Sequence, residues 1–316
     1  MEDFTLKKYE IHPIKKNLFI FLLLVLFLII PISIFANLMT LIFSAVAIVL
    51  LFFYFLIHSI IEKNSFRLTF TENYVSIGKV FINKININLP YEKIQNVTIL
   101  RGPLDRLLNM AGIIIETGEG LVLVRRGKGE LPIILNKISN LHYRDAIEIK
   151  EFLLRKAGIK NLDTKSLKEE FPLEKRRILK ESIKKTILGF IVLSFIAFYM
   201  EKILYAPLLI YIPIFFIFFL FVLFYEFLYF KNYHYSDNEE ILCLRKGVFT
   251  MTEVTIPYKK VQNIFVDQDL LDRIFKLYDV HLSTIGRMSQ IELHIDGVSK
   301  ETAEKLKSFL LKRIKV

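Results

Sequence analysis

The fold is decided by a stretch that occurs twice in the chain. The first copy reads Leu89-Pro90-Tyr91-Glu92-Lys93-Ile94-Gln95-Asn96-Val97 and continues through Leu104-Asp105-Arg106 to Thr117. The second reads Ile256-Pro257-Tyr258-Lys259-Lys260-Val261-Gln262-Asn263-Ile264 and continues through Leu271-Asp272-Arg273 to Thr284. The recurring positions keep one constant spacing (257 − 90 = 167). So many polar identities in register indicate a tandem duplication, and each repeat is one structural unit.

The recurring motif has a structural interpretation. Its members are Pro90, Tyr91, Gln95, Asn96, Asp105 and Arg106 in the first repeat, and Pro257, Tyr258, Gln262, Asn263, Asp272 and Arg273 in the second. Apolar residues do not alternate strictly around Gln95-Asn96, which predicts a single helical turn or a β-bulge there. We expect the polar side chains of the motif to satisfy backbone groups at this irregular strand. An Asp-Arg binding pair is the alternative.

Composition places the chain in a membrane. Of 316 residues, 53% are hydrophobic and the mean hydropathy is +0.42, which is too apolar for an ordinary soluble protein of this length. The net charge of +11 lies outside the apolar blocks, as the positive-inside rule requires, and we expect no nucleic-acid partner. Cys243 is the single cysteine, so an internal disulfide is excluded, and this fits cytosolic soluble parts.

Two apolar blocks predict four transmembrane helices in two hairpins. Residues 18–61 carry no charge and are long enough for two spans, about 18–36 and 39–61. Residues 186–230 form the second hairpin, which Glu201-Lys202 interrupts; its first span is short unless Lys184 and Lys185 snorkel. Basic residues flank both hairpins on one side, which predicts a multi-pass protein of the cell membrane with cytoplasmic termini.

Each hairpin precedes a cytoplasmic module of short strands. We expect modules at 62–158 and 231–316, a polar N-terminal segment at 1–17 and a basic linker at 159–185. A short helix after a cap at Gly102 or Asp269 is predicted in both copies. A helix closes each module, from about 141 to 157 and from Ser299 to about 313. About seven strands and one helix make a small sandwich or barrel.

Basic residues offer a candidate surface for anionic lipid headgroups. They are Arg125, Arg126 and Lys128 in a turn of the first module, and Lys175, Arg176 and Arg177 in the linker. The second module is ten residues shorter and lacks this turn. Ile178, Leu179 and Ile183 lie among the linker charges at helical spacing, which is typical of an amphipathic segment along the inner leaflet. The alternative is that these charges only set the topology.

The sequence shows no catalytic constellation, and we expect no enzyme activity, cofactor or metal. The six histidines have no metal-ligand spacing with cysteine or acidic residues. His281 and His294 are expected to face each other on adjacent strands as structural residues. His58 and Glu226, near the cytoplasmic ends of spans, are candidates for an ion or proton site, against the simpler interpretation of interfacial side chains.

The chain resembles the membrane-associated bacterial-type pleckstrin-homology (PH) domain proteins, in which a transmembrane hairpin precedes each PH-like domain. The resemblance is carried by the two copies of the recurring motif and, in the first, by Gly102-Pro103-Leu104-Asp105-Arg106-Leu107-Leu108. It implies a bent seven-stranded β-sandwich closed at one end by the C-terminal helix. The second module departs from the pattern with Asp269-Leu270 in place of Gly-Pro.

Two functions remain open at this point. The first is a non-enzymatic, membrane-anchored binding or scaffold protein whose PH-like domains engage a protein partner or the anionic inner leaflet. The second is a component of a transporter or a membrane-embedded enzyme that uses the four-helix transmembrane part. The partners expected are the lipid bilayer, anionic headgroups and an unidentified protein, and a homo-oligomer stays open.

Overall fold

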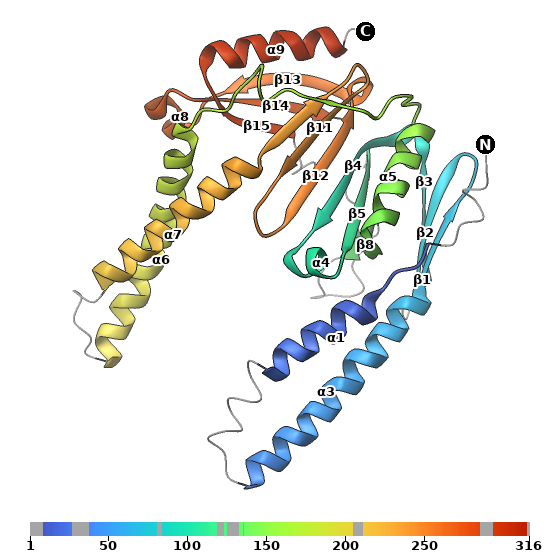
Figure 1. The fold of residues 1–316 in the computed structure, drawn as a ribbon, viewed down its shortest axis with the longest axis vertical. Helices are drawn as coiled ribbons and strands as arrows, with labels where there is room; N and C mark the ends of the chain where they lie inside the picture. The colour runs from blue at the N-terminus through green and yellow to red at the C-terminus, as the bar shows by residue number, and fades with distance from the viewer. Residues whose placement is uncertain are drawn as a thin grey trace. The chain divides into compact units, whose positions relative to one another are not determined.

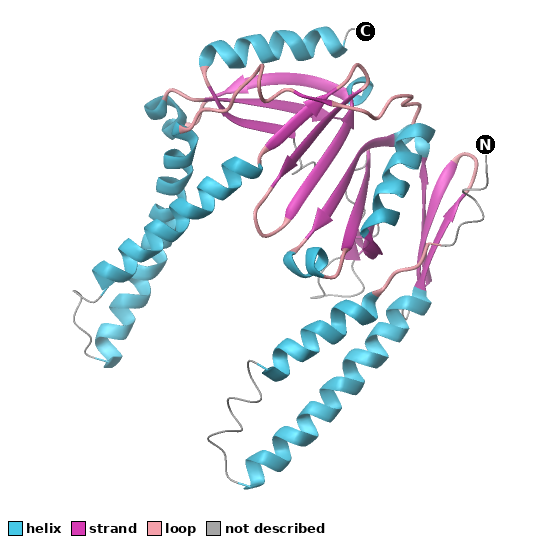
Figure 2. Ribbon diagram, viewed as in Figure 1, coloured by secondary structure: helices cyan, strands magenta, loops and turns pink. Residues whose placement is uncertain are grey.

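The computed structural model describes residues 9–26, 38–80, 84–118, 123–124, 133–134, 136–204, 211–284 and 293–314. They divide into two compact units at Lys160. Each unit consists of a helical hairpin and a module of strands with a closing helix (Figures 1 and 2).

The first unit begins with the hairpin of α1 (Pro13–Leu24) and α3 (Leu38–Ser65). Two antiparallel sheets follow. Strands β1 (Phe66–Phe70), β2 (Tyr74–Val80) and β3 (Lys84–Pro90) form the first sheet in that order. Strands β8 (Lys137–His142), β5 (Met110–Thr117) and β4 (Ile94–Arg101) are neighbours in the second, with α4 (Pro103–Leu107) between β4 and β5. Strands β6 (Leu123–Val124) and β7 (Ile133–Ile134) form a separate pair. Helix α5 (Tyr143–Lys156) packs on β4, β5 and β8.

The second unit repeats this plan. Its hairpin is α6 (Arg176–Leu204) and α7 (Tyr211–Asn232). Strands β12 (Met251–Pro257), β11 (Ile241–Lys246), β10 (His234–Asp237) and β9 (Lys165–Ser166) are neighbours in one sheet. Strands β13 (Val261–Asp267), β14 (Tyr278–Thr284) and β15 (Leu293–Val298) form the other. Helix α8 (Leu270–Phe275) lies between β13 and β14, and α9 (Lys300–Ile314) packs on both strands.

The recurring motif forms the predicted irregularity in both units. A 3-10 turn, Tyr91–Lys93 or Tyr258–Lys260, leads into the strand. The register with the next strand then shifts between Ile94 and Asn96, and between Val261 and Asn263, which is a β-bulge. The helical turn and the bulge that the sequence offered as alternatives are therefore both present, one after the other.

Apolar residues of both sheets and of the closing helix fill the interior of each module. In the first, Val75, Ile94, Ile113, Leu141 and Leu153 are fully buried. In the second, the core also contains Leu167, Phe171 and Leu173. Residues 161–173, which the sequence assigned to a linker, therefore contribute to the second core and to strand β9.

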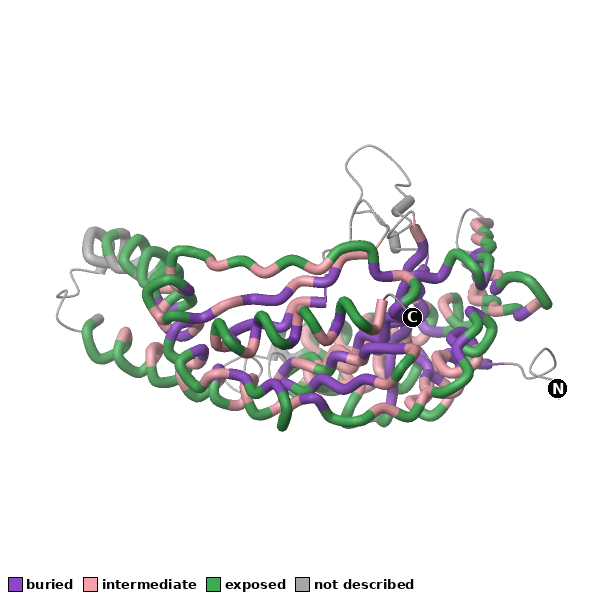
Figure 3. The backbone as a smooth tube through the Cα atoms, turned by 90° about the horizontal axis from the view of Figure 1, so that it is seen from above, coloured by how far each residue is buried: buried purple, intermediate pink, exposed green. Residues whose placement is uncertain are grey.

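Two helices are long and apolar enough to cross a membrane, in the ranges Ile42–Ser65 of α3 and Ile212–Asn232 of α7. Only 6% and 11% of the residues in their most apolar stretches are buried, whereas a core helix of a soluble protein would be mostly buried. The exposed colour predominates on the hairpin helices in Figure 3. The sequence predicted four such helices, and the described residues contain two. The first turns of α6 carry many charged residues, and residues 27–37 and 205–210, between the helices of the two hairpins, lie outside the described part.

In the second unit, both helices that were predicted from N-cap residues are present. Helix α8 begins at the N-cap Asp269, whose carboxylate accepts a hydrogen bond from the backbone N–H of Asp272 at 2.8 Å. Helix α9 begins after Ser299, whose hydroxyl accepts from the N–H of Thr302 at 3.1 Å. Hydrogen bonds from the Asp272 N–H and Lys184 outweigh partial burial and lower the pKa of Asp269 to about 2.

These two caps predict different pH dependence. Asp269→Ala should lower the free energy of unfolding by about 1 kcal/mol at pH 7. Because the pKa of Asp269 is lower in the folded state, its contribution is present above its ordinary pKa of 3.8 and is lost as the pH falls towards 2. The difference in unfolding free energy between the variant and the wild type should therefore shrink from about pH 4.5 to about pH 2.5, measured on the full chain in detergent.

Ser299→Ala is the matched control, because a hydroxyl cap does not titrate in this range. Its destabilisation should be independent of pH. Equal pH profiles for the two variants would contradict the role of the Asp269 charge.

Candidate functional site

One polar contact recurs in both units and joins each hairpin to its module through the aspartate of the motif. In the first unit, Asp105 Oδ2 accepts from the Gly102 N–H at 2.9 Å, while Oδ1 accepts from Lys16 Nζ on α1 at 2.8 Å. In the second, Asp272 Oδ2 accepts from the Asp269 N–H at 3.2 Å, while Oδ1 accepts from Lys180 Nζ on α6 at 2.7 Å. One carboxylate oxygen thus caps the short helix, and the other binds the first helix of the hairpin.

The chain just before each hairpin is held to its module in the same way. The His12 N–H donates to the carbonyl of Asn140 at 2.7 Å, and the Glu174 N–H donates to the carbonyl of Gly297 at 2.8 Å. Asn140 and Gly297 are equivalent positions (297 − 140 = 157), and both have a left-handed backbone, with φ of 62° and 82°. The left-handed turn aims the carbonyl at the incoming chain in both units.

A buried charge cluster surrounds the second of these contacts. Lys180 Nζ lies 2.7 Å from Asp272, 3.0 Å from Asp296, 3.9 Å from Asp279 and 3.3 Å from Glu181, and its side chain is 1% exposed. Burial by itself would lower the pKa of Lys180, but the carboxylates of Asp296 and Asp272 raise it overall. The ammonium fills the space between three carboxylates, and Lys180 stays charged.

Arg177 completes the cluster on the side of the hairpin. Its guanidinium contacts Asp296 at 2.9 Å and lies 5.0 and 5.4 Å from the ring centroids of Tyr229 and Tyr233. Burial would raise the pKa of Asp296, but Arg177 and Lys180 lower it well below its ordinary value. A Cβ on Gly297 would lie 2.7–2.8 Å from carbons of Arg177, so only glycine fits there.

Within each hairpin, one polar contact joins the two helices near the module. Asn17 Nδ2 donates to Ser59 Oγ at 2.9 Å and lies 3.5 Å from His58 Nδ1. Lys185 donates to Glu226, which is fully buried. Ser59 and Glu226 occupy equivalent positions, 167 residues apart. His58 and Glu226, the candidates for an ion site, therefore belong to the links within the hairpins, and Lys185 is bound to Glu226 where the sequence expected it to snorkel.

The other motif residues have mixed roles. The Tyr91 hydroxyl donates to the carbonyl of Thr71 at 3.0 Å, and the Tyr258 hydroxyl to Asp237 at 3.2 Å. Gln95 donates to the carbonyl of Lys93 at 3.4 Å, as predicted for a group that satisfies the backbone. Asn96 instead donates to the Glu116 carboxylate at 2.9 Å.

Five motif residues are exposed: Pro90, Arg106, Gln262, Asn263 and Arg273. The prediction that the Gln262 and Asn263 side chains satisfy backbone groups is wrong, because neither side chain donates or accepts a hydrogen bond within the described residues. Pro90 and Pro257 precede the 3-10 turns with an extended backbone, as N-caps.

The predicted anionic surface is only partly described. Arg125, Arg126 and Lys128 lie outside the described residues. Lys175 and Arg176 are exposed, and Arg176 is 3.4 Å from Glu174. The prediction that Arg177 belongs to this surface is wrong, because its side chain is buried in an ion pair with Asp296. Lys180, in the same segment, is likewise buried, because its ammonium pairs with Asp272 and Asp296.

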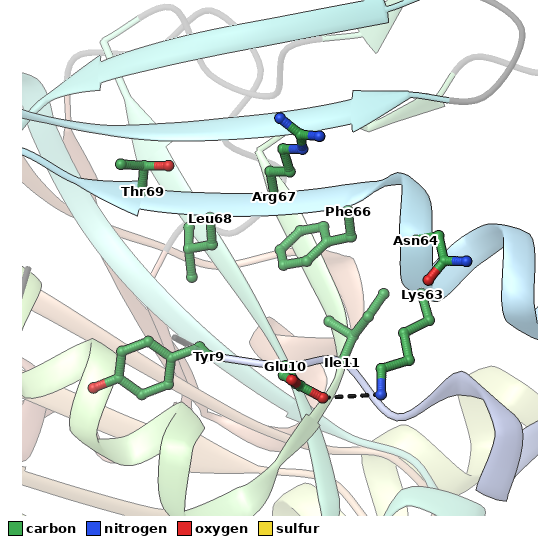
Figure 4. Close-up of a pocket in the computed structure, with 9 residues that line it drawn as sticks. All are labelled: Tyr9, Glu10, Ile11, Lys63, Asn64, Phe66, Arg67, Leu68 and Thr69. Atoms are coloured by element: carbon green, nitrogen blue, oxygen red, sulfur yellow. Dashed lines mark ion pairs between the residues drawn. The ribbon is translucent and has the colours of Figure 1, made fainter. Parts of the chain in front are cut away.

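An open groove of about 440 Å³ lies beside β1 in the first unit. As Figure 4 shows, the extended residues Tyr9–Ile11 form one side, and Phe66 and Leu68 of β1 point towards them. Arg67 and Thr69 point to the opposite face of the strand, and Lys63 closes one end through an ion pair with Glu10 at 2.9 Å. Among the described residues, β1 pairs only with β2, and none of them pairs with its outer edge.

The second unit differs at this edge. Strand β9 pairs with β10, with Ser166 opposite Ser236 and Lys165 opposite Asp237. The Leu167 N–H donates to the carbonyl of Tyr235 at 3.0 Å. Strand β10 is the equivalent of β1, so the chain itself covers in the second unit an edge that no described residue covers in the first.

Comparison with protein families identifies the modules. The model of the family described as "Bacterial PH domain" matches residues 18–156 and 187–314, well over half of the chain. The chain belongs to the bacterial PH domain family. The two matches confirm the tandem repeat and the PH-like domains that the sequence predicted. Comparisons with curated proteins and with solved structures gave no match.

Lys16 and Lys180, the lysines that bind the motif aspartates of the two bacterial PH domain repeats, should contribute differently to the free energy of unfolding. Lys180→Met leaves buried carboxylates without their cation, so the second unit should lose about 3–5 kcal/mol of stability. Lys16→Met removes a partner that is 30% exposed, so the first should lose at most about 1 kcal/mol. Thermal unfolding and limited proteolysis of the full chain in detergent measure both; equal losses would contradict the burial argument.

Gly297 should be coupled to Arg177. Gly297→Ala should destabilise the second unit by more than about 1 kcal/mol, because the new methyl meets Arg177 at a left-handed residue. In an Arg177→Ala background the contact is absent, and the same substitution should be less harmful. A double-mutant cycle of unfolding free energies tests this; strictly additive effects would show that the contact is unimportant.

Proposed function

We propose that the chain is a membrane-anchored, non-enzymatic binding protein, in which two helical hairpins span the bilayer and two PH domains lie on its cytoplasmic side. The exposed apolar faces of α3 and α7 support the anchoring, and α1 and α6 run beside them as the second helix of each hairpin (Figure 1). With four spans, all parts outside the hairpins lie on one side of the membrane.

The distribution of charge supports this orientation. Basic residues stand where each hairpin meets its domain: Lys15, Lys16, Lys63, Lys184, Lys185 and Lys231. Cytoplasmic flanks of membrane spans are enriched in lysine and arginine. We therefore place both termini and both PH domains in the cytoplasm of a multi-pass protein of the cell membrane.

The open edge of β1 is the binding site that this proposal names. An exposed strand edge offers unpaired backbone groups and accepts an extended segment as an additional strand. The groove beside it provides apolar contact from Phe66 and Leu68, and Arg67 supplies an exposed positive charge on the other face of the strand. The occupant that fits is an extended segment of a protein partner with an acidic side chain beside Arg67.

The single observation that carries the proposal is the difference between the repeats. Residues 165–167 occupy the equivalent edge of β10, which shows that this edge of the fold accepts a strand. The anionic leaflet is a further ligand of the same domains, through the exposed Lys175 and Arg176 and the Arg125–Lys128 turn.

A transporter or membrane-embedded enzyme is less well supported. Its candidates, His58 and Glu226, contact Asn17 and Lys185 across their own hairpins, near the domains and away from the middle of the spans where substrate sites are expected.

Site-specific photo-crosslinking in native membranes tests the binding site. A photoreactive residue at Arg67 should give an adduct heavier than the chain by the mass of a partner. The matched control is His234, the position 167 residues on, whose strand is covered by β9. It should give no such adduct.

Two results would overturn the site. An Arg67 adduct that stays at the mass of the single chain would show that the edge is occupied by the chain itself. Equal adducts from both positions would show that the groove has no special role, while the anchoring of the PH domains would stand.

A further inference from the structure

The recurring motif has an exposed part, which is an arginine followed by a large apolar residue. In the second unit these are Arg273 and Ile274 on α8, and in the first unit they are Arg106 and Leu107 on α4. Ile274 and Leu107 are equivalent positions (274 − 107 = 167), and each is 66% exposed. The helix cap and the hairpin contact, which explain the motif aspartate, explain neither the arginine nor the apolar residue.

Leu270 enlarges the apolar surface of α8. It is the first residue of the helix and is 76% exposed. Ile274 follows four residues later, and side chains at this spacing lie on the same face of a helix. Large apolar side chains that gather at a surface mark a site of contact with a partner or a membrane.

An ion pair fixes the level of α8 along its hairpin. Lys184 Nζ on α6 lies 3.1 Å from the carboxylate of the N-cap Asp269, and Leu270 follows this cap directly. The uncharged part of α6 begins only one residue after Lys185, and Ile187 is its first exposed apolar residue. Ile187 comes three residues after Lys184, which is about 4.5 Å along a helix axis. The start of α8 therefore lies within one helical turn of the apolar part of the hairpin.

A second apolar side chain reaches the same level from a turn between strands. Phe249 lies between β11 and β12, and its ring stacks on Tyr225 of α7 at a centroid distance of 5.7 Å and an angle of 22°. Tyr225 precedes Glu226, which binds Lys185 of α6. Phe249 is 54% exposed despite this contact. Two separate elements of the second PH domain thus present apolar side chains beside the first uncharged turn of the hairpin.

We propose that Leu270, Ile274 and Phe249 insert into the headgroup region of the inner leaflet, where Arg273 binds lipid phosphate. This inference rests on the proposed function, in which the hairpins span the bilayer. The headgroup region is about 5–8 Å thick on each side of the hydrocarbon core. Apolar side chains that stand about one helical turn above the start of the uncharged part of α6 lie within that region.

The charges of α8 match this position. Arg273 is exposed, and a guanidinium forms strong charge-assisted hydrogen bonds with phosphate oxygens. The two carboxylates at the start of the helix, Asp269 and Asp272, are paired with lysines of α6 and do not face the headgroups as free negative charges. Apolar residues next to arginine are typical of segments that lie in a membrane interface.

The first unit offers the same contact on a smaller scale. Asp105 holds α4 to α1 by the contact that recurs in the second unit. Leu107 occupies the position of Ile274, whereas Pro103 stands where the second unit has Leu270. We therefore expect α4 to contact the leaflet with less apolar surface than α8.

Single tryptophans test the contact, because the chain contains no tryptophan. Full chains with Leu270→Trp, Ile274→Trp or Phe249→Trp are reconstituted in vesicles of phosphatidylcholine and phosphatidylglycerol. Tryptophan emission is compared with that in vesicles whose phosphatidylcholine is brominated near the headgroup end of its acyl chains. Each variant should be quenched at least about half as strongly as Phe221→Trp, within the span of α7, because interfacial side chains lie about 5–10 Å into the headgroup and acyl boundary.

Leu311→Trp is the matched control and should not be quenched. Leu311 is also an exposed leucine, on α9, and this helix packs on the 3-10 turn at the opposite end of β12 from Phe249. No quenching of Phe221→Trp would contradict the membrane span, and with it the proposed function. If Phe221→Trp is quenched but the three test positions stay at the level of Leu311→Trp, only the leaflet contact is overturned. Blue-shifted but unquenched emission at those positions would overturn it in favour of a protein partner or a second copy of the chain.

Arg273→Glu tests the phosphate contact. In the Ile274→Trp background it should reduce the quenching about twofold, because a carboxylate is repelled by anionic headgroups. Lys312→Glu makes the same change of charge at an exposed position of α9 and should leave the quenching unchanged. Equal quenching with both substitutions would show that Arg273 takes no part in the contact.

Discussion

An aspartate carboxylate shared between a helix N-terminus and a lysine is the interaction on which each repeat depends. Asp105 and Asp272 each use one oxygen for the backbone of the short helix and the other for a lysine of the hairpin. Loss of the carboxylate would remove the cap and the hairpin contact together. These two contacts of one carboxylate explain why Asp occupies the same position in both copies.

The contact places the domain at a fixed point of the hairpin. The backbone bonds from His12 to Asn140 and from Glu174 to Gly297 restrain the same junction from the other side. Each PH domain is therefore attached to its own hairpin as one unit, which is what the proposed binding next to the membrane requires. That arrangement suits a protein that holds a partner at the bilayer.

The repeats have diverged in how strongly this junction is built. The first uses a half-exposed lysine, and the second buries Lys180 and Arg177 among carboxylates. Buried ion pairs are costly to break, although they are not always stabilising overall.

Much of the architecture could be predicted from the sequence, because it is written in local patterns. The duplication, the capped helices α4 and α8, the bulge after Gln95 and the closing helices all follow from spacing and turn chemistry. The lysine partners of the motif could not be found in this way, because Lys16 and Lys180 precede their aspartates by different distances, 89 and 92 residues. Arg177 was assigned to the membrane surface because it stands in a run of basic residues, and only the three-dimensional structure shows Asp296 beside it.

His281 shows the same limit. Its pairing with His294 was predicted from the strands, but its contact with Asp267 arises only through the register of β13 and β14. The difference at the edges of β1 and β10 is likewise invisible in the sequence, because it depends on which described strands pair with them.

Double-mutant cycles on Lys16 with Asp105, and on Lys180 with Asp272, test the central claim most directly. Unfolding free energies of the full chain in detergent should give a favourable coupling in both pairs, larger for the buried pair. Coupling energies of zero in both would show that the aspartates serve only as caps, and that the hairpins are not bound to the PH domains through the recurring motif.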